Sequence, residues 1–354
     1  MSNNHLPALD ALRGIAVLGV ISVHTAAFTM SFSGPSSGVS EALSSLFASG
    51  RMGVELFFIL SGFLMGWLYS DESFSARRFF RSRFLRIWPL WAAFSVIWFA
   101  IFALQENEFR WSALLLSLTF LLWVSPSDFD TFIGGAWSIQ IEVIAYILFA
   151  CLKRFGLNAL IATAIVVNLL GSIASFADLT GEGVLESIRR LSLQTGLNFF
   201  VLGVVVASAL IQSRKSQSPF SWTSIAQLNL KWTLVWLASF LLTPAIYGNP
   251  VEALGFVSLA VLLVSTTKSQ GVFRKVLAWL GRHSYFLFFA HFVGLYILNQ
   301  ATETLEVPEI SSTLLALVTP LAIAIFVALM SPLAWLSMKF VEGPILKLKK
   351  TART

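Results

Sequence analysis

The stretch LDALRGIAVLGVISVHTAAFTMS, residues 9–31, decides the fold class. A helix of about 20 mostly apolar residues crosses a lipid bilayer, and this stretch is long enough to do so. It is also longer than the apolar region of a cleavable signal peptide, roughly 7–15 residues, and it lacks a clear small-residue cleavage site. Asp10, Arg13 and His24 lie within it. We therefore expect a first transmembrane helix that is retained.

The rest of the chain has the composition of a membrane protein. Of its 354 residues, 56% are hydrophobic and only 12% are charged, and the mean hydropathy is +0.78, which excludes an ordinary soluble protein. Aromatic residues make up 14%, as expected for membrane helices with aromatic side chains at the interfaces. The single Cys151 excludes an internal disulfide, and no His or carboxylate spacing resembles a metal site, so we expect no metal.

Ten stretches of the sequence are long and apolar enough to span a membrane. They are residues 9–31, 53–70, 88–104, 136–152, 157–176, 192–211, 232–248, 251–267, 284–300 and 313–337. A further apolar run, residues 111–124, has a length more typical of a re-entrant or interfacial segment. Whether this run crosses the membrane determines the orientation of everything after it.

The distribution of Lys and Arg sets that orientation. If the N-terminus is cytoplasmic and residues 111–124 do not cross, 20 of the 24 basic residues lie in the cytoplasm, as the positive-inside rule requires. The four outside are Arg51, Arg110, Arg189 and Arg190. We therefore predict an all-α polytopic membrane protein with ten transmembrane helices, one short re-entrant or interfacial segment and both termini in the cytoplasm. The net charge of +6 then sets topology, and we expect no nucleic-acid partner.

The spacing of the spans leaves little room for other domains. We expect one integral membrane domain over residues 1–354, with no appended soluble domain and without the internal repeat that many transporters show. The Ser/Gly-rich stretch at residues 31–45 is expected to be an outside loop.

Ionisable residues inside membrane helices are costly, so each is a candidate for function. His24 lies eleven residues beyond Arg13, or about 16 Å along a helix, which places it about 10 Å from the outer surface. Glu142 enters from the outside on the fourth span and reaches a depth of about 9 Å. Because the two depths agree, we predict a catalytic pair of His24 and Glu142, in which the imidazole accepts a proton and the carboxylate orients it.

Neighbouring polar residues extend this candidate site. Ser138 and Tyr146 share a helix face with Glu142 at spacings of four residues. His291, in the middle of the ninth span, is a further candidate, although a packing histidine bonded to a backbone carbonyl has the same signature. His24 and Glu142 would also be accounted for by hydrogen bonds between helices. Glu55 is assigned to the headgroup layer in preference to the site.

A second signal is the basic segment RRFFRSRFLRIWP, residues 77–89, which precedes the third span. Such a segment often anchors topology or binds anionic lipids. It also suits a phosphate site, because guanidinium groups bind phosphate in a bidentate manner and Arg83 and Arg86 lie three residues apart on a helix. Arg13 begins at the same membrane face and is a candidate for the same anion site.

Six motifs in order resemble membrane acyltransferase family 3, over residues 9–344. They are LDALRGIA at 9–16 followed by His24, GVELFFILSGFL at 53–64, RFLRIWP at 83–89, WSIQIE at 137–142 with Tyr146, Ser284-Tyr285 with His291, and FVEGP at 340–344.

This resemblance implies an enzyme of the bacterial inner membrane that moves an acyl group, most often acetyl, from cytoplasmic acyl-CoA to a hydroxyl of a carbohydrate. The acceptor would be a polysaccharide, a lipid-linked saccharide or a small glycoside. It implies that His24 is catalytic and that Arg13, Arg83 and Arg86 bind acyl-CoA, with Glu142 in a further motif. Asp10, Ser138, Tyr146 and His291 are assigned supporting or acceptor-binding roles. Some family members carry a fused extracytoplasmic domain. The resemblance therefore implies that this chain acts either alone or with a separate extracytoplasmic partner protein.

Two mechanisms and one other function class stay open at this point. His24 acts either as a general base on the acceptor hydroxyl or as a nucleophile that forms an acyl-histidine. The alternative function is a proton-coupled transporter or exporter of a lipid-linked saccharide, in which His24 and Glu142 form a relay.

Overall fold

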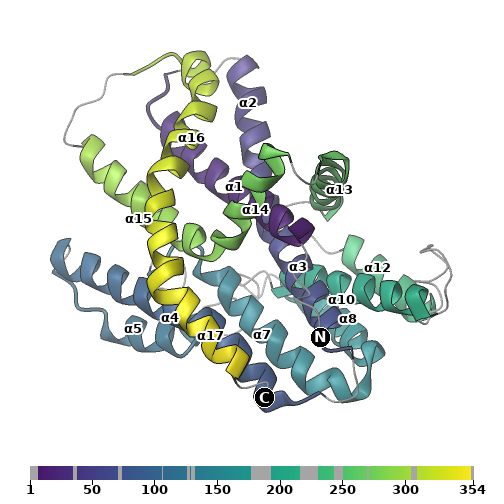
Figure 1. The fold of residues 1–354 in the computed structure, drawn as a ribbon. Helices are drawn as coiled ribbons and strands as arrows, with labels where there is room; N and C mark the ends of the chain where they lie inside the picture. Colours follow the sequence, from purple (N-terminus) through teal and green to yellow (C-terminus); the bar gives the residue numbers. More distant parts are fainter. Residues whose placement is uncertain are drawn as a thin grey trace. The chain divides into compact units, whose positions relative to one another are not determined.

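The computed structural model describes most of the chain as helix (Figure 1). The described residues are 7–34, 38–70, 74–105, 107–125, 128, 132–176, 193–215, 230–242, 250–268, 271–303 and 309–351. Among these residues, the β-type backbone pairing consists of one isolated bridge, between Ser33 and Ile310. The prediction of an all-α membrane protein is confirmed at this level.

The helices follow the apolar stretches of the sequence closely. They are α1 (Pro7–Met30), α2 (Gly38–Ala48), η1 (Ser49–Met52), α3 (Gly53–Leu68), α4 (Ala76–Gln105), α5 (Trp111–Leu118), η2 (Leu122–Val124), α7 (Ala136–Leu152), η3 (Lys153–Phe155), α8 (Leu157–Phe176), α10 (Leu193–Lys215), α12 (Leu230–Leu242), α13 (Pro250–Thr266), α14 (Val272–Arg282), α15 (Ser284–Glu303), α16 (Ser312–Ser337), the π-helix η4 (Met338–Glu342) and α17 (Gly343–Thr351).

Each predicted span coincides with a helix over its described part, and residues 243–248 of the seventh span lie outside the described residues. Five described helical segments are long and apolar enough to cross a membrane by length and composition: Pro7–Met30, Gly38–Leu68, Ala76–Gln105, Gly196–Arg214 and Ser312–Leu348. Leu157–Leu170 and Val251–Thr266 are shorter apolar helices. The count of ten crossings and the cytoplasmic termini therefore stay predictions.

The short run at residues 111–124 is broken into two pieces. Helix α5 has eight residues, which rise only about 12 Å and fall short of a bilayer core of about 30 Å. Phe120 then adopts a positive φ of 59°, which a helix cannot continue through, before the short 3₁₀ turn η2. This geometry agrees with a segment that does not cross.

One expectation about the loops was wrong. The Ser/Gly-rich stretch at residues 31–45 is not a loop throughout, because α2 begins at Gly38 and leads through η1 directly into α3. Val39, Leu43 and Phe47 recur every four residues between the serines of α2, which is the spacing of an apolar helix face. The sequence therefore did contain a helical pattern, although its composition is rich in serine.

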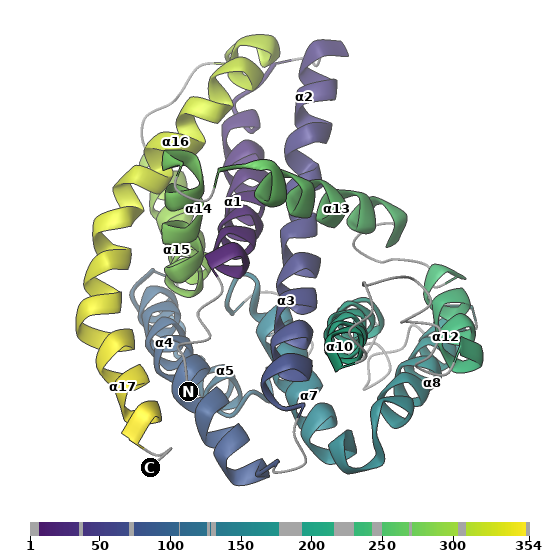
Figure 2. The same cartoon turned by 45° about the vertical axis from the view of Figure 1, so that its right-hand side comes forward.

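The chain divides into two compact units, and each is described by itself. Unit 1 comprises residues 1–54, 85–94 and 255–354. Its centre is α1, which packs against α14, α15, α16, α2 and η1, and Figure 2 shows α14 lying alongside α1. A Cβ at Gly14 would collide with the carbonyl oxygen of Leu277, and one at Gly281 with that of Asp10. Glycine is thus required for the close approach of α1 and α14.

Unit 2 comprises residues 55–84 and 95–254. Helix α8 packs against α10 and α12, and α10 packs against α7. A Cβ at Gly62 would collide with the carbonyl oxygen of Phe200, and one at Gly203 with that of Ile59, so α3 and α10 meet backbone to backbone. Gly66 lies one turn further along α3 and also approaches α10 closely, at Ala207.

Candidate functional site

In unit 1, the structure brings together two histidines that are far apart in the sequence. The ring centroids of His24 on α1 and His291 on α15 lie 5.3 Å apart, at an interplanar angle of 39°. Phe292 contacts both rings, with centroid distances of 4.8 Å to His24 and 4.0 Å to His291. His291 is fully buried, whereas His24 is partly exposed. We call these two residues the histidine pair.

The hydrogen bond of His291 determines its tautomer. Its Nδ1 lies 3.2 Å from the carbonyl oxygen of Leu287, and a carbonyl only accepts, so Nδ1 carries the proton. Its Nε2 is then a bare acceptor, and this atom is buried without a hydrogen-bond partner among the described residues. Leaving a buried acceptor unpaired costs about 1–3 kcal/mol. A histidine that only packs between helices therefore accounts for the hydrogen bond of Nδ1 but leaves the unpaired Nε2 unexplained.

The start of α1 carries the first basic candidate. Arg13 Nη1 lies 4.0 Å from Asp10 Oδ1, one helical turn away, and both side chains are largely buried. Because Gly281 contacts the main chain at Asp10, this pair lies against the end of α14. Asp10 thus positions Arg13, which agrees with a supporting role.

Arg86 lines a small cavity of about 40 Å³ in unit 1, together with Arg282, Tyr285 and Glu342. The Tyr285 hydroxyl donates to the carbonyl of Ile87 at 3.1 Å, and the Ser337 hydroxyl donates to Glu342 Oε1 at 3.1 Å. Glu342 lies in the π-helix η4, a distortion often found at functional sites. We call this group the arginine cavity.

In unit 2, Glu142 is the centre of a second polar group. Its Oε1 accepts hydrogen bonds from the hydroxyls of Ser61 on α3 and Tyr146 on α7, each at 2.6 Å. The guanidinium of Arg83 lies over the Tyr146 ring, 5.7 Å from its centroid. We call Ser61, Arg83, Glu142 and Tyr146 the carboxylate cluster.

Arg83 is more buried than expected for a residue at an aqueous anion site. It is only 7% exposed, and its Nη2 donates to Ser82 Oγ at 3.2 Å. Its Nε is buried without a hydrogen-bond partner among the described residues. Arg83 is therefore buried next to Tyr146 within the carboxylate cluster, whereas Arg86 is partly exposed at the arginine cavity.

Other predicted residues are placed as follows. Ser138 donates its hydroxyl to the carbonyl of Gly135 at 2.9 Å, within the first turn of α7. Glu55 is only 3% exposed, so its side chain packs against protein neighbours, and its depth in the membrane stays a prediction. His24 belongs to unit 1 and Glu142 to unit 2, so the pairing of His24 with Glu142 stays a prediction.

Several polar residues had no assigned role in the sequence analysis. Gln140 is buried, and its Oε1 accepts a hydrogen bond from the main-chain nitrogen of Trp123 at 3.0 Å, which ties η2 to α7. Asn168 and Asn198 bond each other at 2.6 Å, and Asn198 accepts from the Trp236 indole at 2.7 Å. Asparagine within an apolar span was the available signal, because an unpaired amide is costly in a membrane.

Comparison with known proteins adds the family. A family model described as "Acyltransferase domain", of acyltransferase family 3, matches residues 6–336. The chain belongs to this family. The match extends over both units and over five of the six motifs, and the sixth motif, at residues 340–344, lies beyond its end.

Three relatives of the chain are named as acyltransferases or O-acetyltransferases. O-acetyltransferase OatA of Staphylococcus aureus is 24% identical over 98% of this chain and 58% of its own length. Peptidoglycan O-acetyltransferase OatA of Listeria monocytogenes is 26% identical over 98% of this chain and 56% of its own. Acyltransferase MdmB of Streptomyces mycarofaciens is 32% identical over 41% of this chain and 38% of its own. The chain thus spans somewhat more than half the length of the OatA proteins. No solved structure matches it.

Proposed function

We propose that the chain is an integral membrane O-acyltransferase that moves an acyl group, acetyl in the first instance, from acyl-CoA to a hydroxyl of a cell-envelope carbohydrate. Family membership supports acyl transfer, and the names of the two OatA relatives support an acetyl group and a glycan acceptor. The histidine pair is the observation that carries the proposal. It supplies a proton acceptor beside a second, buried acceptor that has no hydrogen-bond partner among the described residues.

In the proposed reaction, His24 acts as the general base. It takes the proton of the acceptor hydroxyl while the oxygen attacks the thioester carbonyl of acyl-CoA. The tetrahedral intermediate collapses, the ester forms, and the CoA thiolate leaves and takes up the proton from the His24 imidazolium. During the step the imidazolium lies next to the buried His291, whose Nε2 lone pair can accept a hydrogen bond from it.

The basic residues are proposed to hold the anionic part of acyl-CoA. Arg86 shares its cavity with a second guanidinium, Arg282, which suits a phosphate group because two forks can bind it together. Arg13, fixed by Asp10, is the third such residue. Arg83 and Glu142, linked through Tyr146 in unit 2, are proposed to take part in the same reaction.

The test uses full-length protein in lipid nanodiscs, acetyl-CoA and peptidoglycan fragments as a first acceptor. His24→Ala is expected to abolish CoA release while the thermal midpoint of unfolding stays close to that of the wild type. Thr29→Val is the matched control, because Thr29 lies on the same helix as His24 but its hydroxyl bonds the hydroxyl of Thr319 and not a group of the histidine pair. Near wild-type transfer by His24→Ala would refute the role. Proton-coupled uptake into vesicles without acyl transfer would favour the transporter alternative.

The proposed topology has ten crossings, with both termini on the cytoplasmic side of the bacterial inner membrane. Single cysteines at Phe109 and Val124, in a Cys151→Ala background, test the segment between them, since all three side chains are exposed. An impermeant thiol reagent added outside is expected to label both. Labelling of Phe109→Cys alone would show that residues 111–124 cross, and it would reverse the orientation of all later spans.

A further inference from the structure

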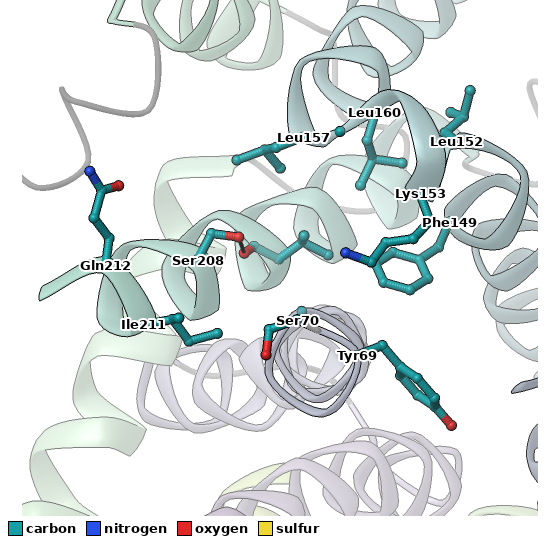
Figure 3. Close-up of a pocket in the computed structure, with 13 residues that line it drawn as sticks. Tyr69, Ser70, Phe149, Leu152, Lys153, Leu157, Leu160, Ser208, Ile211 and Gln212 are labelled. Carbon is teal, nitrogen blue, oxygen red and sulfur yellow. Dashed lines mark hydrogen bonds between the residues drawn. The ribbon is translucent and has the colours of Figure 1, made fainter. Parts of the chain in front are cut away.

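Unit 2 contains a cavity of about 360 Å³ that has no part in the proposed acyl transfer (Figure 3). It lies where the ends of α3 and α7, the start of α8 and the last turns of α10 come together. Its rim is exposed at Ser70 and Gly156, so a ligand can reach it from outside the protein. The volume falls within the range of about 300–1,000 Å³ that small-molecule sites occupy.

The cavity has one charged lining residue, Lys153. Figure 3 shows its side chain reaching from the end of α7 toward the middle of the lining residues, while Tyr69 directs its hydroxyl away from them. Among the described residues no carboxylate lies within ion-pair distance of the Lys153 amine. A lysine that points into a cavity, with no anionic partner in the described part of the chain, supplies an ammonium with three donors.

The remaining wall is mainly apolar. Phe149, Leu160 and Val204 form a buried surface behind the lysine, and Leu157 and Ile211 continue it toward the rim. The lining therefore combines a single positive charge at one point with apolar side chains and with the polar groups of Ser70, Ser208 and Gln212. A matching ligand carries one negative group and a long apolar chain.

We propose that this cavity binds an anionic phospholipid, with the headgroup phosphate on Lys153 and the start of an acyl chain along Leu157, Leu160 and Val204. Acyl-CoA has the same general chemistry, a phosphate ester on a long flexible chain. Its three phosphate groups exceed what one lysine neutralises, whereas the single phosphodiester of a phospholipid matches it. In the proposed topology the lysine also lies at the inner leaflet, where anionic lipids attract basic residues.

The experiment measures lipid retention by native mass spectrometry of the full chain. The probes are dioleoyl phosphatidylglycerol, the zwitterionic dioleoyl phosphatidylcholine and acetyl-CoA. Lys153→Gln is expected to weaken retention of phosphatidylglycerol about tenfold, the size of one charge-assisted hydrogen bond. Arg154→Gln is the matched control, because this adjacent cation lies over the Phe155 ring and does not line the cavity. It is expected to retain the lipid.

A second pair of variants tests the cavity itself. Ser208→Leu places a larger apolar side chain in the lining of α10 and is expected to displace the lipid with Lys153 intact, whereas Ser208→Ala is expected to retain it. Equal loss in Lys153→Gln and Arg154→Gln would overturn the proposal in favour of general surface charge. Displacement of the lipid by acetyl-CoA, or equal retention of the two lipids, would also overturn it. Acyl transfer is not part of the readout, so the result is independent of the proposed reaction.

Discussion

Replacement of His291 by methionine tests the histidine pair, because it removes the lone pair of Nε2 with little change in side-chain volume. In the wild type this buried acceptor is unpartnered among the described residues, which costs about 1–3 kcal/mol of stability. The carbonyl of Leu287 also receives the main-chain N–H of residue 291 within α15, so the substitution leaves that carbonyl paired. His291→Met is therefore expected to fold as stably as the wild type or more so.

Activity is expected to change in the opposite direction. A hydrogen bond to a charged group contributes about 1.5–3 kcal/mol, so loss of the acceptor for the His24 imidazolium should lower kcat about 10- to 100-fold. The KM for acetyl-CoA should stay unchanged, since the interaction develops only as the proton moves. The assay is CoA release in nanodiscs with a saturating glycan acceptor, together with the thermal midpoint of unfolding.

His291→Gln distinguishes positioning from packing, because its amide oxygen can again accept a hydrogen bond. It is expected to recover part of the rate that His291→Met loses. An unchanged kcat in His291→Met would refute the reasoning. A fall in kcat that follows a fall in the thermal midpoint in both variants would assign His291 to packing alone.

Three further predictions concern groups outside the histidine pair. Tyr146→Phe removes one of the two hydroxyl donors to Glu142 but keeps the ring, so kcat/KM should fall about tenfold, as measured by CoA release, and an unchanged value would make the carboxylate cluster structural. Asn198→Leu should lower the free energy of unfolding by about 1–3 kcal/mol in a denaturation experiment, because it leaves the amide network of α8, α10 and α12 unpaired. Burial lowers the pKa of His283 below its usual 6.5, and a hydrogen bond to the Trp279 carbonyl offsets part of that effect. As the pH falls, His283 is therefore protonated in the unfolded state at a higher pH than in the folded state, which favours unfolding. The thermal midpoint of unfolding should fall as the pH drops below about 6.5. In His283→Gln the thermal midpoint should depend less on pH over this range.

The helices were predictable because length and apolar composition alone define them. Each predicted span coincides with a helix over its described part, and the eight-residue α5 agrees with a non-crossing run at residues 111–124. Helix α2 was missed because serine and glycine usually mark loops, which hid the apolar side chains at helical spacing. Burial of Glu55 was missed as well, since membrane depth along a helix does not determine which neighbours surround a side chain.

The candidate site was predictable only where its members share one helix. The bond between Tyr146 and Glu142 follows from their spacing of four residues. The contact between His24 and His291 joins α1 to α15, and the bond from Ser61 joins α3 to α7. Such contacts depend on how helices pack, and no local rule relates residues separated by so much sequence.

Arg83 and Arg86 show how far a spacing rule reaches. Three residues apart on α4, they belong to one helix face, and one shared phosphate site was the simplest interpretation. Yet Arg83 is buried on the Tyr146 ring, while Arg86 lines the arginine cavity with Arg282. A guanidinium that is 7% exposed has lost most of its water, so its charge acts on the neighbouring Tyr146 ring more than on a soluble anion. Geometry thus separates the two arginines of one motif, and we propose that Arg86 binds the nucleotide of acyl-CoA while Arg83 acts on the groups around Tyr146.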